Sequence, residues 1–179
     1  MSNLQAALVV IIPFSIATFF IWRWIFSGGL DSVGSEEEMK EKNRRFRDRQ
    51  LNPDFEAFKN KFGVDVPEHL KNIYRKTELF DEDAYSLMSN VIDFKGNEQS
   101  LYFAWIERMD EEYLNQPMWP GTENYFSFAN DGSGDQYLLD PKLEDSEIYY
   151  YEHETSKKIG TGVKLSQVEA SIKVDETEY

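Results

Sequence analysis

The sequence predicts an α+β domain, a mainly antiparallel sheet with helices packed on it, preceded by one transmembrane helix. Apolar residues recur at helical spacing between residues 55 and 74, and β-rich segments separated by turn signals fill residues 86–154. A helix-start pattern follows at Ser166. The predicted order is helices, then strands, then a helix. This order is typical of α+β folds, whereas folds with a parallel sheet alternate strands and helices.

The transmembrane prediction rests on an apolar run from Ala6 to Phe26 that contains a single arginine. Its 21 residues extend about 32 Å as a helix, and a bilayer core measures about 30 Å. A cleaved signal peptide would need basic residues before the run and a small-residue cleavage site after it. A buried soluble helix would rarely stay apolar on all sides over this length. Because the run lacks the signal-peptide pattern and is apolar throughout, we expect residues 1–26 to remain as an anchor.

The flanks of this run predict how it is oriented. Trp22, Arg23 and Trp24 stand where interfacial aromatic and snorkelling basic residues belong. No basic residue precedes the run, whereas six more follow it at Lys40, Lys42, Arg44, Arg45, Arg47 and Arg49. Since basic flanks stay in the cytoplasm, we expect a single-pass membrane protein with its N-terminus outside and its globular domain in the cytoplasm.

Residues 27–50 are predicted to join the anchor to the domain. Glycine and serine dominate residues 27–35, which is typical of a linker, and residues 36–50 form a charged helix. This helix is open to two interpretations. It is a solvated stem with i,i+4 pairs such as Glu38 with Lys42, or a patch that contacts anionic lipid.

The globular domain, residues 51–179, is expected to open with two helices. The first begins at Asn52-Pro53, an N-cap and first-turn pair, and ends at Gly63. Its apolar face consists of Phe55, Phe58 and Phe62. The second begins near Pro67, and its apolar face consists of Leu70, Ile73 and Tyr74.

Strands and turns are expected to follow. Turn residues at 95–98 and 130–135 separate β-rich segments, and Pro141 ends one of them. The expected strands are 86–94, 100–106, 125–129, 136–140 and 147–154, with a short helix at 110–115. A last helix begins at Ser166, where Ser166 and Glu169 have the spacing of a capping box.

Composition excludes several function classes. The chain has no cysteine, which excludes disulfide frameworks and thiolate zinc sites. It carries 33 acidic against 19 basic side chains, a net charge of −14, and residues 51–179 alone hold 27 acidic and 12 basic ones. Because such a surface repels phosphate backbones, we expect no nucleic-acid partner and favour a basic protein.

No motif for catalysis or cofactor binding is present. The sequence lacks a P-loop, a dinucleotide glycine pattern and a nucleophile elbow, and we expect His69 and His153 to be surface histidines without a metal. The turn fails as an EF-hand loop, since Gln136 replaces the glycine at position 6 and Lys142 replaces the glutamate at position 12. We therefore expect no enzyme, no cofactor and no small-molecule substrate.

Three segments resemble the SUKH superfamily, bacterial immunity-type domains related to a yeast regulator of cell-wall synthesis. The segments are 126–140, read as FSFANDGSGDQYLLD, then 147–154, read as EIYYYEHE, and the helix-forming stretch 66–74. The resemblance covers about residues 53–172 and departs from the family at residues 76–79, where the family often has a glycine turn. It implies an α+β domain without catalytic residues that binds and blocks toxins, many of them nucleases.

The sequence therefore predicts a membrane-anchored immunity protein that neutralises a polymorphic, basic toxin domain. The alternatives are a SUKH-like binding module for a cellular partner in envelope maintenance or signalling, and a hydrolase of unknown type. An exposed acidic rim is expected to hold the partner, formed by Asp131, Asp135, Glu152 and Glu154. Gly132 and Gly134 are expected to serve the geometry of the turn.

Overall fold

The computed structural model describes residues 35–80, 86–116 and 119–175. The chain divides into two compact units, Met1–Arg44 and Arg45–Tyr179. The predicted anchor, with Trp22, Arg23 and Trp24, lies outside the described residues. Among the residues that are described, no helix combines the length and the apolar character needed to cross a membrane.

The charged helix predicted at residues 36–50 is confirmed as α2 (Glu36–Leu51). It begins with a capping box, in which Glu38 accepts from the Ser35 N–H at 2.9 Å and Ser35 Oγ accepts from the Glu38 N–H at 3.2 Å. In the second unit, the last turn of α2 is fixed to the domain. The Gln50 side-chain amide donates to the carbonyl of Ile106, and Arg49 pairs with Glu112.

The two apolar helices are confirmed as α3 (Phe55–Phe62) and α4 (Glu68–Arg75). The predicted start of α3 at Asn52-Pro53 is wrong. Asp54 is the N-cap, because its carboxylate accepts from the Ala57 N–H at 2.9 Å. The predicted end is confirmed, since Gly63 adopts φ +73°.

Helix α4 buries the apolar face that its spacing predicts, Leu70, Ile73 and Tyr74. The next segment, where the family resemblance weakened, forms a 3-10 helix, η1 (Thr77–Phe80). Leu79 and Phe80 are buried in it. This segment therefore contributes to the core although its sequence has no glycine turn.

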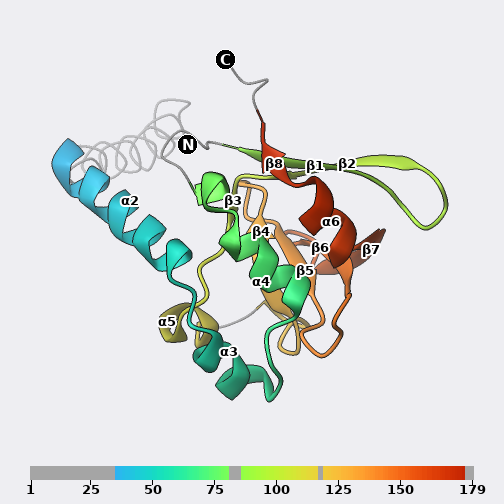
Figure 1. The fold of residues 1–179 in the computed structure, drawn as a ribbon, viewed down its shortest axis with the longest axis horizontal. Helices are drawn as coiled ribbons and strands as arrows, with labels where there is room; N and C mark the ends of the chain where they lie inside the picture. The colour runs from blue at the N-terminus through green and yellow to red at the C-terminus, as the bar shows by residue number, and fades with distance from the viewer. Residues whose placement is uncertain (1–34, 81–85, 117–118, 176–179) are drawn as a thin grey trace, which may run out of the picture. The chain divides into compact units, whose positions relative to one another are not determined.

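The strands form two antiparallel sheets, of order β2-β1-β8 and β3-β4-β5-β6-β7 (Figure 1). The remaining helices are α5 (Glu111–Leu114) and α6 (Leu165–Ser171). The strands are β1 (Leu87–Ile92), β2 (Glu98–Phe103), β3 (Trp105–Ile106), β4 (Phe126–Asn130), β5 (Gln136–Leu139), β6 (Glu147–Glu152), β7 (Lys157–Lys164) and β8 (Lys173–Val174). The α+β class with antiparallel sheets and helices is thus confirmed.

One predicted strand divides between the two sheets. Residues 100–106 were expected to be continuous, but the chain bends at Ala104. Before the bend β2 pairs with β1, and after it β3 pairs with β4, while the Ala104 N–H donates to the carbonyl of Asn130 at 2.8 Å. The bent segment therefore connects the β1–β2 hairpin to the β4–β5 hairpin.

Two strands and the start of the last helix differ from the prediction. Strands β7 and β8 were not predicted. Helix α6 begins at Leu165, where Gln167 Oε1 accepts from the Lys164 N–H at 2.9 Å. The predicted capping box at Ser166 and Glu169 is wrong, because the Ser166 N–H and hydroxyl are bonded to Asp145 instead.

The core lies between the sheets and the helices packed on them. Its fully buried members include Phe58 of α3, Leu70 of α4, Phe103 of β2, Phe128 of β4 and Val168 of α6. Helix α6 packs against both α4 and β1. The Phe58 ring also packs edge-to-face on Phe126 of β4, the strand that leads into the turn with the predicted acidic residues.

Candidate partner-binding surface

The β4–β5 turn is attached to the core through Asn130. The Asn130 side chain is buried, accepts from the Gly132 N–H at 2.9 Å, and donates to Glu107 Oε1 at 2.6 Å. Burial raises the pKa of Glu107 above its usual value, although the hydrogen bond from Asn130 opposes the shift. A buried amide–carboxyl pair thus fixes the beginning of the turn.

Asp131 organises the turn itself. Its Oδ1 accepts the backbone N–H of Ser133 at 2.9 Å and that of Asp135 at 3.2 Å. Gly132 and Gly134 adopt φ +83° and +109°, a region that side chains disfavour. A Cβ at Gly134 would also lie 3.1 Å from the ring of His153. Both glycines therefore have the backbone geometry expected of turn residues.

Tyr150 of β6 links the two aspartates of the turn. Its hydroxyl lies 2.9 Å from Asp131 Oδ2 and 2.6 Å from Asp135 Oδ2. Because a phenol has one hydroxyl hydrogen, it donates to one carboxylate at a time. Burial raises the pKa of Tyr150 well above its usual value, and the two carboxylates add to the shift. The pair of charges is thus held on either side of one phenol.

His153 completes this cluster. Asp135 Oδ1 accepts from the His153 N–H at 2.9 Å and lies 2.6 Å from His153 Nδ1. Burial alone would raise the pKa of Asp135, but hydrogen bonds from Tyr150 and His153 outweigh it and hold the pKa below its usual range. The side chains of Asp135 and His153 are 17% and 30% exposed. Asp135 is therefore less exposed than the predicted acidic rim requires, whereas His153 is partly exposed, as expected of a surface histidine.

The other histidine is also engaged rather than free on the surface. His69 Nδ1 lies 2.9 Å from Glu169 Oε2, which joins α4 to α6. Within the described parts of the chain, no three His, Asp or Glu side chains lie close enough to hold a metal ion. Both histidines are thus placed by carboxylates in the described structure.

The four predicted partner-binding residues fall into two pairs. Asp131 and Asp135 are brought together by Tyr150. Glu152 and Glu154 flank His153 in the chain; Glu152 accepts from Thr155 Oγ1 at 2.7 Å, and Glu154 is exposed. No contact in the structure tests whether these residues bind a partner, so that role stays a prediction.

Sequence reasoning missed the aromatic residues that support this surface. Tyr150 and His153 bond the turn, and the Trp119 ring lies 5.9 Å from that of His153 while the Trp119 side chain remains 43% exposed. The three consecutive tyrosines were predicted only as strand residues. The available signal was the alternation of a strand, which places Tyr150 on the face opposite to Tyr149 and Tyr151.

Comparison with known proteins identifies the family. Neither the curated proteins nor the solved structures include a significant match to the chain. The model of the SMI1 / KNR4 family (SUKH-1) matches residues 52–167, more than half of the chain. The matched range includes both sheets except β8, and it includes the turn at residues 131–135. The chain therefore belongs to the SMI1 / KNR4 family (SUKH-1).

Proposed function

We propose that this chain is a membrane-anchored, non-catalytic immunity protein that binds and neutralises a basic toxin domain. Membership of the SUKH-1 family over residues 52–167 is the observation that carries the proposal. Domains of this family are generally non-catalytic and of the immunity type, so a protein partner is favoured over a substrate.

The charge of the domain supports a basic partner. Residues 51–179 hold 27 acidic and 12 basic side chains. An acidic surface accelerates the encounter with a basic cleft, such as the one by which a nuclease holds its substrate. Covering that cleft would block the toxin without any chemical step.

The turn offers a preorganised contact. Its backbone is fixed by Asp131, and its two carboxylates are held by Tyr150. Groups that are already ordered lose little conformational entropy on binding. We place the partner against Asp131, Asp135, Glu152 and Glu154, with Glu154 the most accessible of the four.

Attachment to the membrane is part of the same proposal. The apolar run of residues 1–26, followed by basic residues, supports an external N-terminus with residues 51–179 in the cytoplasm as the binding domain. Residues 27–50 would hold the domain near the membrane. Protease added to intact cells should spare the domain, and opened cells should lose that protection. Digestion in intact cells would contradict this topology.

Neutralisation is tested with the toxin domain encoded by the neighbouring gene. Expression of that domain alone should stop growth, and co-expression of the full chain should restore it. The two proteins should also form a complex of defined stoichiometry. If no neighbouring gene encodes a toxin, or if the toxin remains active and unbound, the immunity function is wrong and a cellular partner in envelope maintenance or signalling becomes the better explanation.

A further inference from the structure

Strand β2 presents an open edge beside the acidic turn. In the three-stranded sheet, β2 is the outer strand, and β1 is its strand neighbour. The register between β1 and β2 runs without interruption from Leu87 opposite Phe103 to Ile92 opposite Glu98. In an antiparallel strand, successive residues direct their backbone N–H and C=O groups alternately toward opposite sides.

Contacts of β1 and β2 identify which residues point outward. On the far side of β1, the carbonyl of Ser86 accepts from the Asp175 N–H, and the carbonyl of Ile92 accepts from Gln167. The odd-numbered residues of β1 therefore direct their backbone N–H and C=O groups toward β2, where they pair with Phe103, Leu101 and Gln99. The backbone groups of the even-numbered residues of β2 consequently point away from β1, toward the open edge.

The outward groups of β2 are only partly satisfied. The backbone of Tyr102 is hydrogen-bonded to the hydroxyl of Tyr137, which the β5 strand supplies. Ser100 and Glu98 are the outward-facing residues that precede Tyr102 on the same edge. Within residues 35–80, 86–116 and 119–175, we find no partner for the backbone N–H of either one. Two outward residues offer about four backbone hydrogen bonds to an added strand.

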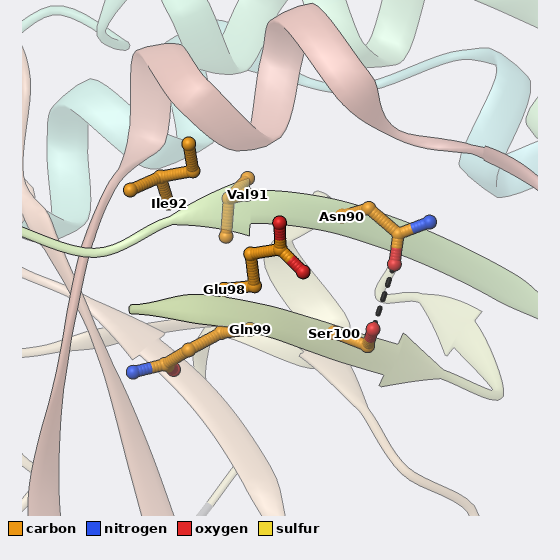
Figure 2. Close-up of a pocket in the computed structure, with 6 residues that line it drawn as sticks. All are labelled: Asn90, Val91, Ile92, Glu98, Gln99 and Ser100. Atoms are coloured by element: carbon orange, nitrogen blue, oxygen red, sulfur yellow. Dashed lines mark hydrogen bonds between the residues drawn. The ribbon is translucent and has the colours of Figure 1, made fainter. Parts of the chain in front are cut away.

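The edge has few of the features that usually prevent strand addition. Such edges are blocked by charged side chains, lysine above all, by proline or by a bulge, and Glu98 is the one charged residue of β2. The sequence of β2, EQSLYF, contains neither proline nor lysine, and its pairing with β1 has no bulge. The exposed side of the hairpin also carries apolar groups, since Ile92 is 57% and Tyr102 is 53% exposed. Figure 2 shows the hollow over this part of the hairpin, with Ser100 bonded to Asn90.

Charge indicates which strand fits. Glu98 is exposed at the start of the open edge. At the other end, a Cβ on Gly132 would lie 3.1 Å from the Cβ of Ala104, which places the acidic turn directly beyond β2. Carboxylates thus stand at both ends of the open edge of β2. In the β1–β2 turn, which precedes Glu98, Lys95 is an exposed basic residue. A strand with alternating basic and apolar residues complements this arrangement.

We propose that the open edge of β2 at Glu98 and Ser100 captures an extended, basic segment of the protein partner as an added antiparallel strand. Main-chain hydrogen bonds to Ser100 and Glu98 would supply affinity, and the carboxylates at the two ends would select basic side chains. This inference rests on the proposed function, because it describes how the toxin domain is held.

A proline substitution tests the role of the outward N–H. Ser100→Pro removes a group that β1 does not use, so the fold should persist. Its affinity for the neighbouring-gene toxin domain should fall about tenfold or more, while Ser100→Val, which keeps the N–H and loses the bond to Asn90, should bind within about twofold of wild type. Equal binding by both variants, while wild type still neutralises the toxin, would overturn the strand and leave the proposed function intact.

Amide exchange in the wild-type full-length chain gives a test that needs no substitution. In a mild non-ionic detergent, the amides of Glu98 and Ser100 should exchange rapidly, and those of Gln99 and Leu101 slowly. A capped peptide of alternating lysine and valine should slow Glu98 and Ser100 about fivefold or more, whereas a glutamate–valine peptide should not. Protection by both peptides, or by neither, would overturn the proposal.

A second copy of the chain is the competing occupant of this edge. Pairing of two copies would protect Ser100 without any peptide, in proportion to protein concentration, and light scattering would report a dimer. That result would also overturn the proposal. If the toxin domain fails to bind at all but the lysine–valine peptide protects both amides, the edge is correct and the partner assigned under the immunity function is wrong.

Discussion

The turns of the β1–β2 and β4–β5 hairpins use the same local chemistry for different purposes. Asp93 accepts the backbone N–H of Lys95 and of Asn97, both at 2.8 Å, as Asp131 accepts those of Ser133 and Asp135. Each turn also has a glycine in the left-handed region, at φ +86° for Gly96 and +83° for Gly132. An aspartate at the start thus replaces the hydrogen bonds that a tight turn leaves unmade.

The difference lies in where the second carboxylate oxygen is used. Asp93 Oδ2 accepts from Asn97 and Gln99 of its own hairpin. Asp131 Oδ2 is bonded to Tyr150, two strands away, and thereby to Asp135 and His153. The Asp93 carboxylate thus serves its own hairpin, which contacts β7 through other groups, the Phe94 N–H to the Gly162 carbonyl at 3.0 Å and the Gln99 amide to the Thr161 carbonyl at 3.1 Å. The Phe94 residue is 73% exposed beside the open edge. The Asp131 carboxylate is instead bonded across strands to Tyr150, which is the arrangement expected of a rigid contact.

Valine substitutions at the glycines of the two turns should give the largest difference in the free energy of unfolding. Gly96→Val strains the backbone at φ +86° but meets no atom within 4 Å, so it should cost about 1–3 kcal/mol. Gly134→Val combines similar strain with the contact to His153, which adds about 1–3 kcal/mol for overpacking. Urea unfolding measures both. A loss at Gly134 no larger than at Gly96 would mean that His153 moves aside freely.

Removal of the shared hydroxyl should have a smaller effect. Tyr150→Phe leaves Asp131 and Asp135 without their common donor, and the free energy of unfolding should fall by about 1.5 kcal/mol. Tyr102→Phe, on the exposed side of the β1–β2 hairpin, should change it by less than about 0.5 kcal/mol. Equal effects would contradict the idea that the Tyr150 hydroxyl stabilises the second turn across strands.

Acid should reveal how far the first turn depends on the charge of Asp93. Hydrogen bonds, the side chain of Asn97 first, lower the pKa of Asp93 to about 2. Because this pKa is depressed on folding, the stabilisation is present above about pH 4, the ordinary range of the unfolded chain, and is lost as the pH falls through about 2. The stability difference between wild type and Asp93→Asn should therefore narrow between pH 5 and 2. A constant difference would show that Asp93 acts without its charge.

Local signals in the sequence were sufficient for much of the fold. Phe58 and Leu70 lie on faces that the 3.6-residue period predicts, and Gly63 ends α3 as expected. Strand β7 was missed because its sequence, KKIGTGVK, combines lysine and glycine, which are rare in strands. The bend at Ala104 was missed because the apolar alternation continues through it, and only pairing with two different strands reveals it.

The candidate surface was predictable only where its structure depends on residues that are close together in the sequence. Asp131, Gly132 and Gly134 were placed in a turn from their spacing alone. The contact of Tyr150 with both aspartates depends on the register that sets Tyr150 opposite Tyr137 across β5 and β6. Contacts across strands, with Tyr150 and His153, likewise leave the Asp135 side chain only 17% exposed. Contacts across strands require the register, which a single sequence does not specify.

The central claim is that the acidic surface beside the β4–β5 turn contacts a basic toxin domain, and association kinetics test it most directly. Glu152→Gln with Glu154→Gln removes two charges there, and Glu56→Gln with Glu78→Gln removes two exposed charges elsewhere in the domain. At low salt, the first pair should slow association with the neighbouring-gene toxin domain about fivefold or more, and the second pair less than twofold. High salt should bring the wild-type rate down to that of the first pair. Equal rates for both pairs at low salt would contradict the claim and place the interface on another face.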